Sequence, residues 1–255
     1  MIRGIAFDLF DTLVDQNHGR LAPVEIEGGR RVGATTPALH ATIRDRVGHP
    51  ISLAEFAELQ REVDRALRAE TIDRGLELPT PERFAALAAR LECPDVPSIA
   101  EALTEAHMGM LREAVTVPPH HAPILTTLAL DYPLALCSNF SHAPTARALL
   151  GQVGLAEHLH TVVISDEVGV RKPRREIFEA VVEGFGLEPR EILHVGDNLE
   201  ADVAGAAAVG MRTVWLTRCV ADPESVFARY EGARPDFSLE DLADLPVLLA
   251  RLNAT

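Results

Sequence analysis

Short apolar runs separated by helical patterns constrain the fold of this chain more than any other feature of its sequence. Each run has the length of a buried strand, and the segments near the later runs follow a helical repeat. Strands are expected at 2–7, 133–138, 161–165, 192–196 and 212–216. Helices are expected at 120–130, 141–151, 174–186 and 199–209. Strands that alternate with helices in this way predict an α/β fold with a parallel sheet covered on both faces.

A long segment after the first strand breaks this alternation. Its apolar residues follow a helical repeat throughout, which predicts an all-helical block with helices at 37–47, 52–74, 81–92 and 97–114. Ser52, Thr80 and Ser98 suit helix N-caps, and Pro81 suits a first helical turn.

The break in the pattern predicts two domains. Residues 1–16 and 116–255 would form the core domain, and residues 17–115 would form a helical domain inserted after the first strand. A short strand near residue 236 and a helix at 239–252 are expected to close the chain.

Charge and cysteine usage narrow the class of partner. The net charge of −14 repels nucleic acid and anionic membranes, so neither is expected as a partner. Cys93, Cys137 and Cys219 lie too far apart to indicate a disulfide framework or a zinc site. Neither a long apolar span nor a signal-peptide pattern is present. We therefore expect a cytoplasmic protein that acts on a small molecule, in an oligomeric state that the sequence does not indicate.

Polar residues follow several of the expected strands, where parallel sheets place their chemistry. Asp8 ends the first strand and is the candidate nucleophile, because a carboxylate can attack phosphorus or carbon and divide one difficult step into two. Thr12 follows closely and can bind backbone or substrate oxygens. Ser138 and Asn139 end the next strand and are candidate substrate ligands. Alone, each segment is also compatible with a turn or a helix cap.

The only lysine of the chain is Lys172, all other basic residues being arginine. An ammonium group is a compact point charge, which can bridge a carboxylate and a substrate anion in one small pocket. Asp197 and Asp202 follow the fourth strand and can face Asp8 across the mouth of the sheet. Carboxylates this close repel one another unless a cation is present, and hard oxygen ligands suit Mg²⁺.

The order and spacing of these four segments resemble the haloacid-dehalogenase-like hydrolase superfamily. The resemblance covers the whole chain and implies a Rossmann-like three-layer core with a cap domain that closes over the active site. It implies that Asp8 forms the covalent intermediate, and that Ser138 and Lys172 bind the substrate. It further implies a metal shell of Asp8, the backbone carbonyl of Phe10 and Asp197, supported by Asp202.

Two positions depart from the phosphatases of this family. Those enzymes carry an acid two residues after the nucleophile to protonate the leaving group, and here that residue is Phe10. Asp11, one residue later, is a candidate substitute. Dehalogenases of the family have an aromatic residue at this place, but they usually lack an acid at the position of Asp197 and have a tyrosine where Phe178 stands.

Three functions therefore stay open. The favoured one is Mg²⁺-dependent hydrolysis of a small phosphomonoester through an aspartyl-phosphate. The second is metal-free dehalogenation of a 2-haloacid. The third is a weakly active or non-catalytic protein that binds a phosphorylated ligand. The sequence does not name the substrate.

Overall fold

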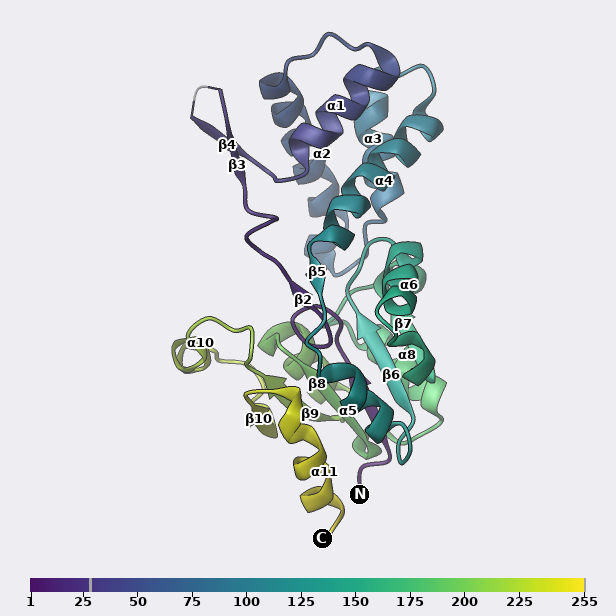
Figure 1. The fold of residues 1–255 in the computed structure, drawn as a ribbon, viewed down its shortest axis with the longest axis vertical. Coiled ribbons are helices and arrows are strands. Elements are labelled where there is room, and N and C mark those ends of the chain that lie inside the picture. The colour runs from purple at the N-terminus through teal and green to yellow at the C-terminus, as the bar shows by residue number, and fades with distance from the viewer. Residues whose placement is uncertain (28, 255) are drawn as a thin grey trace. The chain divides into compact units, whose positions relative to one another are not determined.

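The computed structural model describes residues 1–27 and 29–254, and the chain forms two compact units. One unit, called the core unit here, comprises Met1–Asp15 and Thr116–Thr255. The other, called the inserted unit, comprises Gln16–Val115. Figure 1 shows the fold of the two units.

The core unit is built on a six-stranded sheet with strand order β10-β9-β8-β1-β6-β7. Its strands are β1 (Gly4–Phe7), β6 (Leu134–Ser138), β7 (Thr161–Ile164), β8 (Ile192–Gly196), β9 (Arg212–Leu216) and β10 (Phe237–Leu239). Every neighbouring pair is parallel. The first strand of the chain thus lies inside the sheet, between β8 and β6, and the predicted α/β class is confirmed.

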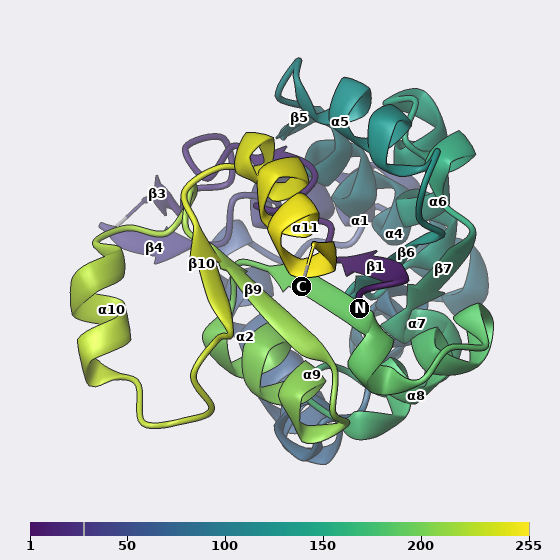
Figure 2. The same cartoon turned by 90° about the horizontal axis from the view of Figure 1, so that it is seen from below.

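Helices cover both faces of this sheet (Figure 2). They are α5 (His121–Leu128), α6 (Ala143–Gln152), α7 (Ser165–Val168), α8 (Arg175–Phe185), α9 (Gly205–Ala208), α10 (Pro223–Arg229) and α11 (Leu245–Asn253). Short turns of helix add η2 (Ala156–His158), η3 (Pro189–Glu191), the π-helix η4 (Leu199–Ala204) and η5 (Leu242–Asp244). In Figure 2, α8 and α9 lie on one face, with α5 and α11 on the other.

Close packing of α8 against the sheet and against α9 depends on small residues. Ala6 and Ala135 on the strands share a buried apolar cluster with Phe178 of α8. At Gly205, an added Cβ would lie 2.5 Å from the Phe178 ring, so only glycine fits there. Phe178 is therefore a core residue, and its ring meets that of His194 edge-on at 5.3 Å.

The inserted unit has its own apolar core, formed by four helices. These are α1 (Thr36–Val47), α2 (Leu53–Glu70), α3 (Thr80–Arg90) and α4 (Val96–Glu113), with the single turn η1 (Ile72–Arg74) after α2. Buried side chains of all four helices, such as Leu39, Phe56, Phe84 and Leu103, form one cluster. A unit with a separate hydrophobic core matches the definition of a domain.

One of the three helix N-caps predicted from the sequence is confirmed. Ser52 caps α2 in a capping box with Glu55. The predictions for Thr80 and Ser98 were wrong. Thr80 is the first helical residue, after Pro79, and the Ser98 amide instead donates to the side chain of Asp95, which caps α4.

The inserted segment is not all-helical, which corrects the sequence prediction. Strands β3 (Val24–Ile26) and β4 (Arg30–Val32) pair as an antiparallel hairpin before α1. Runs of three residues are too short for the alternation of a strand to be read against a helical repeat. Where the chain leaves and re-enters the core unit, β2 (Asp15–Gln16) and β5 (Val115–Thr116) form a two-stranded sheet.

A helix that crosses a membrane must be both long and apolar. Among the described residues, none of the helices combines the length and apolar character needed to cross a membrane.

Candidate active site

Adjacent strands bring the predicted polar residues to one edge of the sheet. Asp8 directly follows β1, Ser138 ends β6 and Asp197 directly follows β8. Strands β8, β1 and β6 are neighbours and run parallel, so their carboxyl ends lie side by side. The Asp8 amide continues the ladder by donating to the carbonyl of Val195, at 2.9 Å. The sheet therefore holds the backbone of the candidate nucleophile rigidly.

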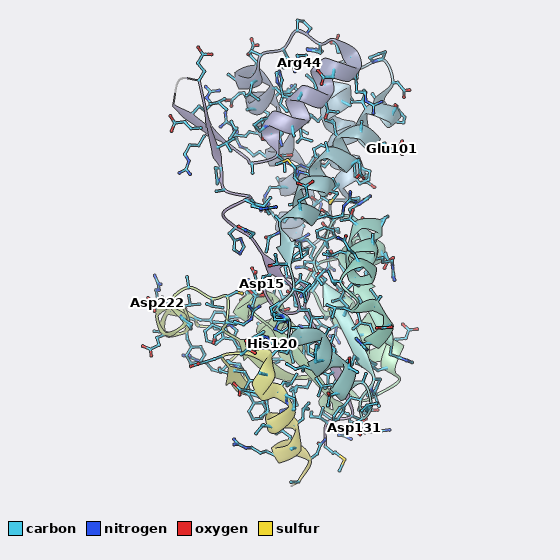
Figure 3. The ribbon with its side chains drawn as sticks, in the orientation of Figure 1. Asp15, Arg44, Glu101, His120, Asp131 and Asp222 are labelled. Carbon is cyan, nitrogen blue, oxygen red and sulfur yellow. The ribbon has the colours of Figure 1, made fainter. Side chains whose placement is uncertain are left out.

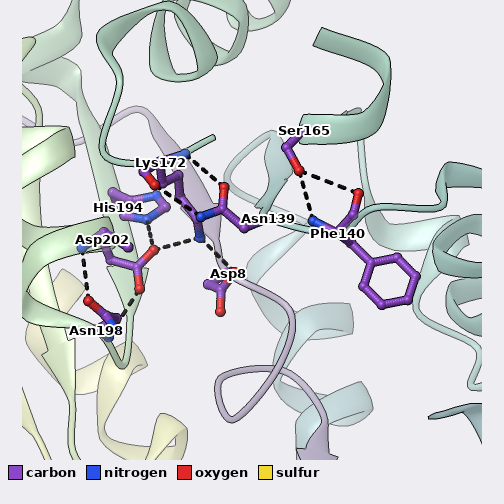
Figure 4. Close-up of polar contacts among 9 residues, drawn as sticks. Asp8, Asn139, Phe140, Ser165, Lys172, His194, Asn198 and Asp202 are labelled. Carbon is purple, nitrogen blue, oxygen red and sulfur yellow. Dashed lines mark hydrogen bonds and ion pairs between the residues drawn. The ribbon is translucent and has the colours of Figure 1, made fainter. Parts of the chain in front are cut away.

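Lys172 joins the carboxylates of two distant segments (Figure 4). Its Nζ lies 2.6 Å from Oδ1 of Asp8 and 2.6 Å from Oδ1 of Asp202. The lysine is 5% exposed and Asp202 1%. Burial by itself lowers the pKa of Lys172, but the charges of Asp202 and Asp8 outweigh it and raise the pKa overall. The ammonium group is therefore charged at any physiological pH.

Asn139 fixes the loop that carries this lysine. Its Nδ2 donates to the Lys172 carbonyl at 3.0 Å, and its Oδ1 accepts the Lys172 amide at 2.7 Å. Both ends of the carboxamide are thereby engaged with backbone. The next residue in the chain, Phe140, is held in turn by the hydroxyl of Ser165, which accepts its amide at 2.9 Å.

Asp202 is held by more groups than the sequence indicated. Its Oδ1 also accepts a hydrogen bond from Nε2 of His194, at 3.0 Å, and its Oδ2 accepts the Asn198 amide, at 3.1 Å. Burial by itself raises the pKa of Asp202, but the charge of Lys172 and the bonds from His194 and Lys172 lower it overall. Asp202 is therefore an ionised counter-charge to Lys172.

His194 is the residue of this network that the sequence prediction missed. It lies on β8, 1% exposed, in a run that is otherwise apolar. The carboxylate of Asp202 can only accept, so Nε2 carries the proton. A polar residue inside an apolar strand was the one available signal.

Backbone geometry brings Asp202 under the strand end. Asp202 lies in η4, a π-helical turn of the kind that often occurs at functional sites. An added Cβ at Gly196 would lie 2.3 Å from the Asp202 carboxyl carbon. Glycine is therefore required at 196 for this approach.

The acidic residues form a group that fits a divalent cation. Asp8, Asp197 and Asp202 each offer an oxygen within 4.8 Å of the others. Burial, followed by the charges of Asp8, Asp202 and Asp11, raises the pKa of Asp197 to about 8. A divalent cation beside these carboxylates would favour the ionised form of Asp197. The carbonyl oxygen of Phe10 accepts no hydrogen bond from the described residues, because the local turn uses the Leu9 carbonyl instead.

Two buried hydroxyls at the site have no partner. The side-chain oxygens of Thr12 and Ser138 are fully buried and make no hydrogen bond within the described residues. An unsatisfied buried hydroxyl is costly, by about 1–3 kcal/mol. Ligand oxygens would satisfy both groups, as predicted for a substrate-binding serine and threonine.

Phe10 packs its ring against Phe140, with centroids 5.2 Å apart, and so presents no proton donor. Asp11 has a left-handed backbone, with φ of 57°, and its charge acts on Asp197. Asp15 is committed elsewhere: it pairs with Arg218, whose hydrogen bond lowers its pKa despite partial burial. Of the acids in this segment, Asp11 stays the candidate donor.

A second group of potential metal ligands lies on the core unit, formed by His120, His121 and Asp241. The carboxylate of Asp241 already interacts with two other side chains. His120 Nε2 lies 2.8 Å from Asp241 Oδ1, and Arg218 Nε lies 3.8 Å from Asp241 Oδ2. The group at Asp8 includes Asp197, whose carboxylate makes no ion pair within the described residues, so it is the better candidate.

Comparison with known proteins places the chain among enzymes. The model of the haloacid dehalogenase-like hydrolase family matches residues 2–210. The phosphoserine phosphatase of Thermus thermophilus is 34% identical over 156 residues, covering 60% of this chain and 59% of that protein, less than two thirds of its length. The glyceraldehyde 3-phosphate phosphatase of Pyrococcus abyssi is 30% identical over 220 residues, covering 85% and 82%.

Solved structures share the fold over nearly the whole chain. A 2-haloacid dehalogenase from Pseudomonas syringae pv. Tomato DC3000 has a TM-score of 0.69 at 22% identity and covers 99% of this chain and 100% of that one. A HAD phosphatase from Thermococcus onnurineus has a TM-score of 0.64 at 24% identity, covering 97% and 98%. Together with the family match, these findings show that the chain belongs to the haloacid dehalogenase-like hydrolases.

Proposed function

We propose that the chain is a Mg²⁺-dependent phosphatase that acts on a small phosphomonoester. The observation that carries this proposal is the contact of Lys172 with Asp8 beside a second acidic group, Asp197. A lone ammonium group next to a nucleophilic carboxylate suits an anionic electrophile such as a phosphoryl group.

Asp8 is the proposed nucleophile. Lys172 occupies Oδ1, which leaves Oδ2 of Asp8 to attack phosphorus. The new bond joins Oδ2 to phosphorus, the bond from phosphorus to the ester oxygen breaks, and the leaving oxygen takes a proton from Asp11 or from solvent to give the alcohol. Water then attacks the same phosphorus and loses a proton to the same group or to solvent, the bond from Oδ2 to phosphorus breaks, and inorganic phosphate leaves with Asp8 restored. Dividing the reaction in this way is nucleophilic catalysis.

Three groups are proposed to hold the phosphoryl oxygens. Lys172 supplies a charge, while the partnerless hydroxyls of Ser138 and Thr12 supply hydrogen bonds. Asn139 and Asp202 are assigned to positioning, since one fixes the lysine backbone and the other its ammonium group. Direct substrate contact by Asn139, which the sequence suggested, stays a prediction.

Mg²⁺ is proposed to bind between Asp8, the carbonyl of Phe10 and Asp197, where it would neutralise negative charge on the phosphoryl group. The fit rests on the three clustered carboxylates and on the raised pKa of Asp197. Support of this shell by Asp202 is the weakest part of the assignment, because Lys172, His194 and Asn198 already occupy both of its oxygens.

Phe10 bears on the choice of leaving group. Without an acid at this position, the enzyme is expected to favour esters whose alcohol leaves without protonation, unless Asp11 donates the proton. The same observation keeps 2-haloacid dehalogenation as a second candidate, because a halide needs no proton.

The inserted unit, residues 16–115, is proposed as the cap that selects the substrate.

A substrate panel tests this proposal. Purified protein is incubated with aryl and alkyl phosphates and with small 2-haloacids, each with Mg²⁺ and with EDTA, and both phosphate and halide are measured. Phosphate release that EDTA abolishes supports the phosphatase. Halide release that is indifferent to EDTA would establish the alternative, and no release of either would favour a non-catalytic phospho-ligand-binding protein. The relatives named as phosphatases support the first outcome.

A further inference from the structure

The inserted unit contains a pocket that is lined entirely by its own residues. It has a volume of about 310 Å³, and all its lining residues lie between Arg31 and His107. They come from the end of the β3–β4 hairpin and from all four helices of the unit. The volume is at the lower end of the range for small-molecule sites, which suits a ligand of a few heavy atoms.

The pocket has a buried polar floor. Gln60 of α2 is 7% exposed and Thr36 of α1 is 3% exposed. The Thr36 hydroxyl donates to Oε1 of Gln60 at 3.0 Å. The amide nitrogen of Gln60 has no hydrogen-bond partner among the described residues, although both of its N–H groups are donors. This nitrogen is not fully enclosed, so it can offer a ligand in the pocket up to two hydrogen bonds.

Among the described residues, one unpaired arginine gives this pocket a positive rim. The pocket is lined by Arg31, Arg61 and Arg83 and by one acid, Asp64, and Arg61 pairs with Glu58 at 2.7 Å. Arg83 neutralises Asp64 in a two-point ion pair, with Nε 2.7 Å from Oδ1. Arg31 has no ion pair within the described part of the chain and is exposed at the rim. The local field therefore favours an anion against the field of the whole protein.

A helix terminus adds to the same preference. Thr35 and Thr36 line the pocket at the N-terminus of α1, and no side chain caps that helix. The Thr36 amide already donates to the Gly33 carbonyl, at 3.0 Å, and Pro37 has no N–H, so this terminus contributes partial positive charge and no free amide at these residues. The remaining polar wall is His107, whose Nδ1 lies 3.0 Å from the Thr35 hydroxyl.

We propose that this pocket binds the carboxylate or phosphoryl group of a small molecule through the side chains of Gln60 and Arg31. The proposal stands apart from the phosphatase proposal, because it concerns only residues of the inserted unit. The anion has two conceivable sources: the far end of the substrate itself, or a separate effector.

Calorimetric titration of the full-length protein with malonate and with inorganic phosphate tests the proposal, with malonamide as the uncharged control. Binding of malonate or phosphate, and not of malonamide, is expected. Gln60→Leu and Arg31→Ala are each expected to weaken this binding about ten-fold. Gln60→Glu should weaken it further, because the new carboxylate has nearly the same shape but repels an anion.

The matched control is Arg44→Ala, which removes an exposed arginine of the same unit that does not line the pocket (Figure 3). It should leave affinity unchanged. Circular dichroism of each variant confirms that it is folded. The proposal is overturned if neither anion binds, or if folded Gln60→Glu and Arg31→Ala bind as tightly as the natural protein.

Kinetics separate the two sources of the anion. Phosphoserine and phosphoethanolamine differ by one carboxylate. If the pocket takes the far end of the substrate, Gln60→Leu raises KM for phosphoserine about ten-fold and hardly changes KM for phosphoethanolamine. If it takes an effector, the two substrates respond alike, and malonate alters the rate of the natural protein but not of Gln60→Leu. Because anion binding is measured without turnover, an inactive protein would contradict the phosphatase proposal alone.

Discussion

The Lys172 Nζ atom lies 2.6 Å from Oδ1 of Asp8, although 164 residues separate the two in the chain. The same ammonium group is 2.6 Å from Asp202 on its other side. One buried cation is thus shared by two buried carboxylates, and it links Asp8, which directly follows β1, to the turn that follows β8.

Removal of Lys172 is expected to cost both stability and activity. In Lys172→Met, Asp8 and Asp202 lose their shared counter-charge, which should reduce the free energy of unfolding by about 3 kcal/mol. Urea denaturation measures this loss. Phosphate release should fall below detection in the same protein.

A double variant separates the two effects. Lys172→Met combined with Asp202→Asn removes the orphaned charge along with the lysine, so much of the lost stability should return. Activity should not return, because no cation is left beside the nucleophile. Recovery of activity in the double variant would show that Lys172 has only a structural role.

Phe10→Asp is expected to supply the missing acid. General acid help is worth about 10²–10⁴-fold, and alkyl phosphates need it more than aryl phosphates do. The ratio of alkyl to aryl phosphatase rates should therefore rise at least ten-fold. Loss of the ring contact with Phe140 should cost about 1 kcal/mol of stability.

The control for this substitution is Phe10→Asn, which has the size of the aspartate but cannot transfer a proton. If Phe10→Asn changes the alkyl-to-aryl ratio as much as Phe10→Asp, the effect comes from space near Asp8. The leaving-group argument would then be wrong.

Mg²⁺ should stabilise the protein through Asp197. A ligand that binds only the folded state raises the melting temperature, and a metal would relieve the repulsion that, together with the larger effect of burial, raises the pKa of Asp197 to about 8. Differential scanning fluorimetry should show a Mg²⁺-dependent rise in Tm that EDTA reverses and that Asp197→Asn lacks. An equal rise in Asp197→Asn would place the metal elsewhere.

Acid should destabilise the inserted unit through His107. Burial, with the charge of Arg83, lowers the pKa of His107 from 6.5 to about 4. Between these values the unfolded chain binds a proton that the folded chain does not, so this contribution to stability is full above pH 6.5 and declines as the pH falls toward 4. The shift corresponds to roughly 3 kcal/mol at most.

Urea denaturation at pH 7 and at pH 4.5 measures this contribution. His107→Gln keeps a hydrogen-bonding group near Thr35 but cannot titrate. The variant should lose less stability than the natural protein between the two pH values. Identical losses would mean that His107 does not contribute to acid sensitivity.

The parts of the site that the sequence predicted best are those set by chain order. Asp8, Ser138 and Asp197 could be placed together because each follows a strand, and parallel strands share one carboxyl edge. Lys172 was identified by its chemical isolation among arginines. Its contact with Asp8 then follows from the fold rather than from any local pattern.

Other features depend on tertiary contacts and carried no local signal. The expected helix at 199–209 is divided into the π-helix η4 and the short α9, and the π-turn is where Asp202 reaches Lys172 and His194. For Asn139, which was predicted to bind substrate, the structure adds a contact without a local signal: its carboxamide holds a backbone segment 33 residues away. Hydrogen bonds between distant segments do not appear in sequence periodicity.

The most direct test of the account is to trap the covalent intermediate. The natural protein is mixed with an aryl phosphate and Mg²⁺, quenched in acid within one turnover and analysed by peptide mass spectrometry. The account predicts the added mass of one phosphoryl group on the peptide that contains Asp8, and neither adduct nor phosphate release with Asp8→Asn. Undiminished phosphate release by Asp8→Asn would contradict it.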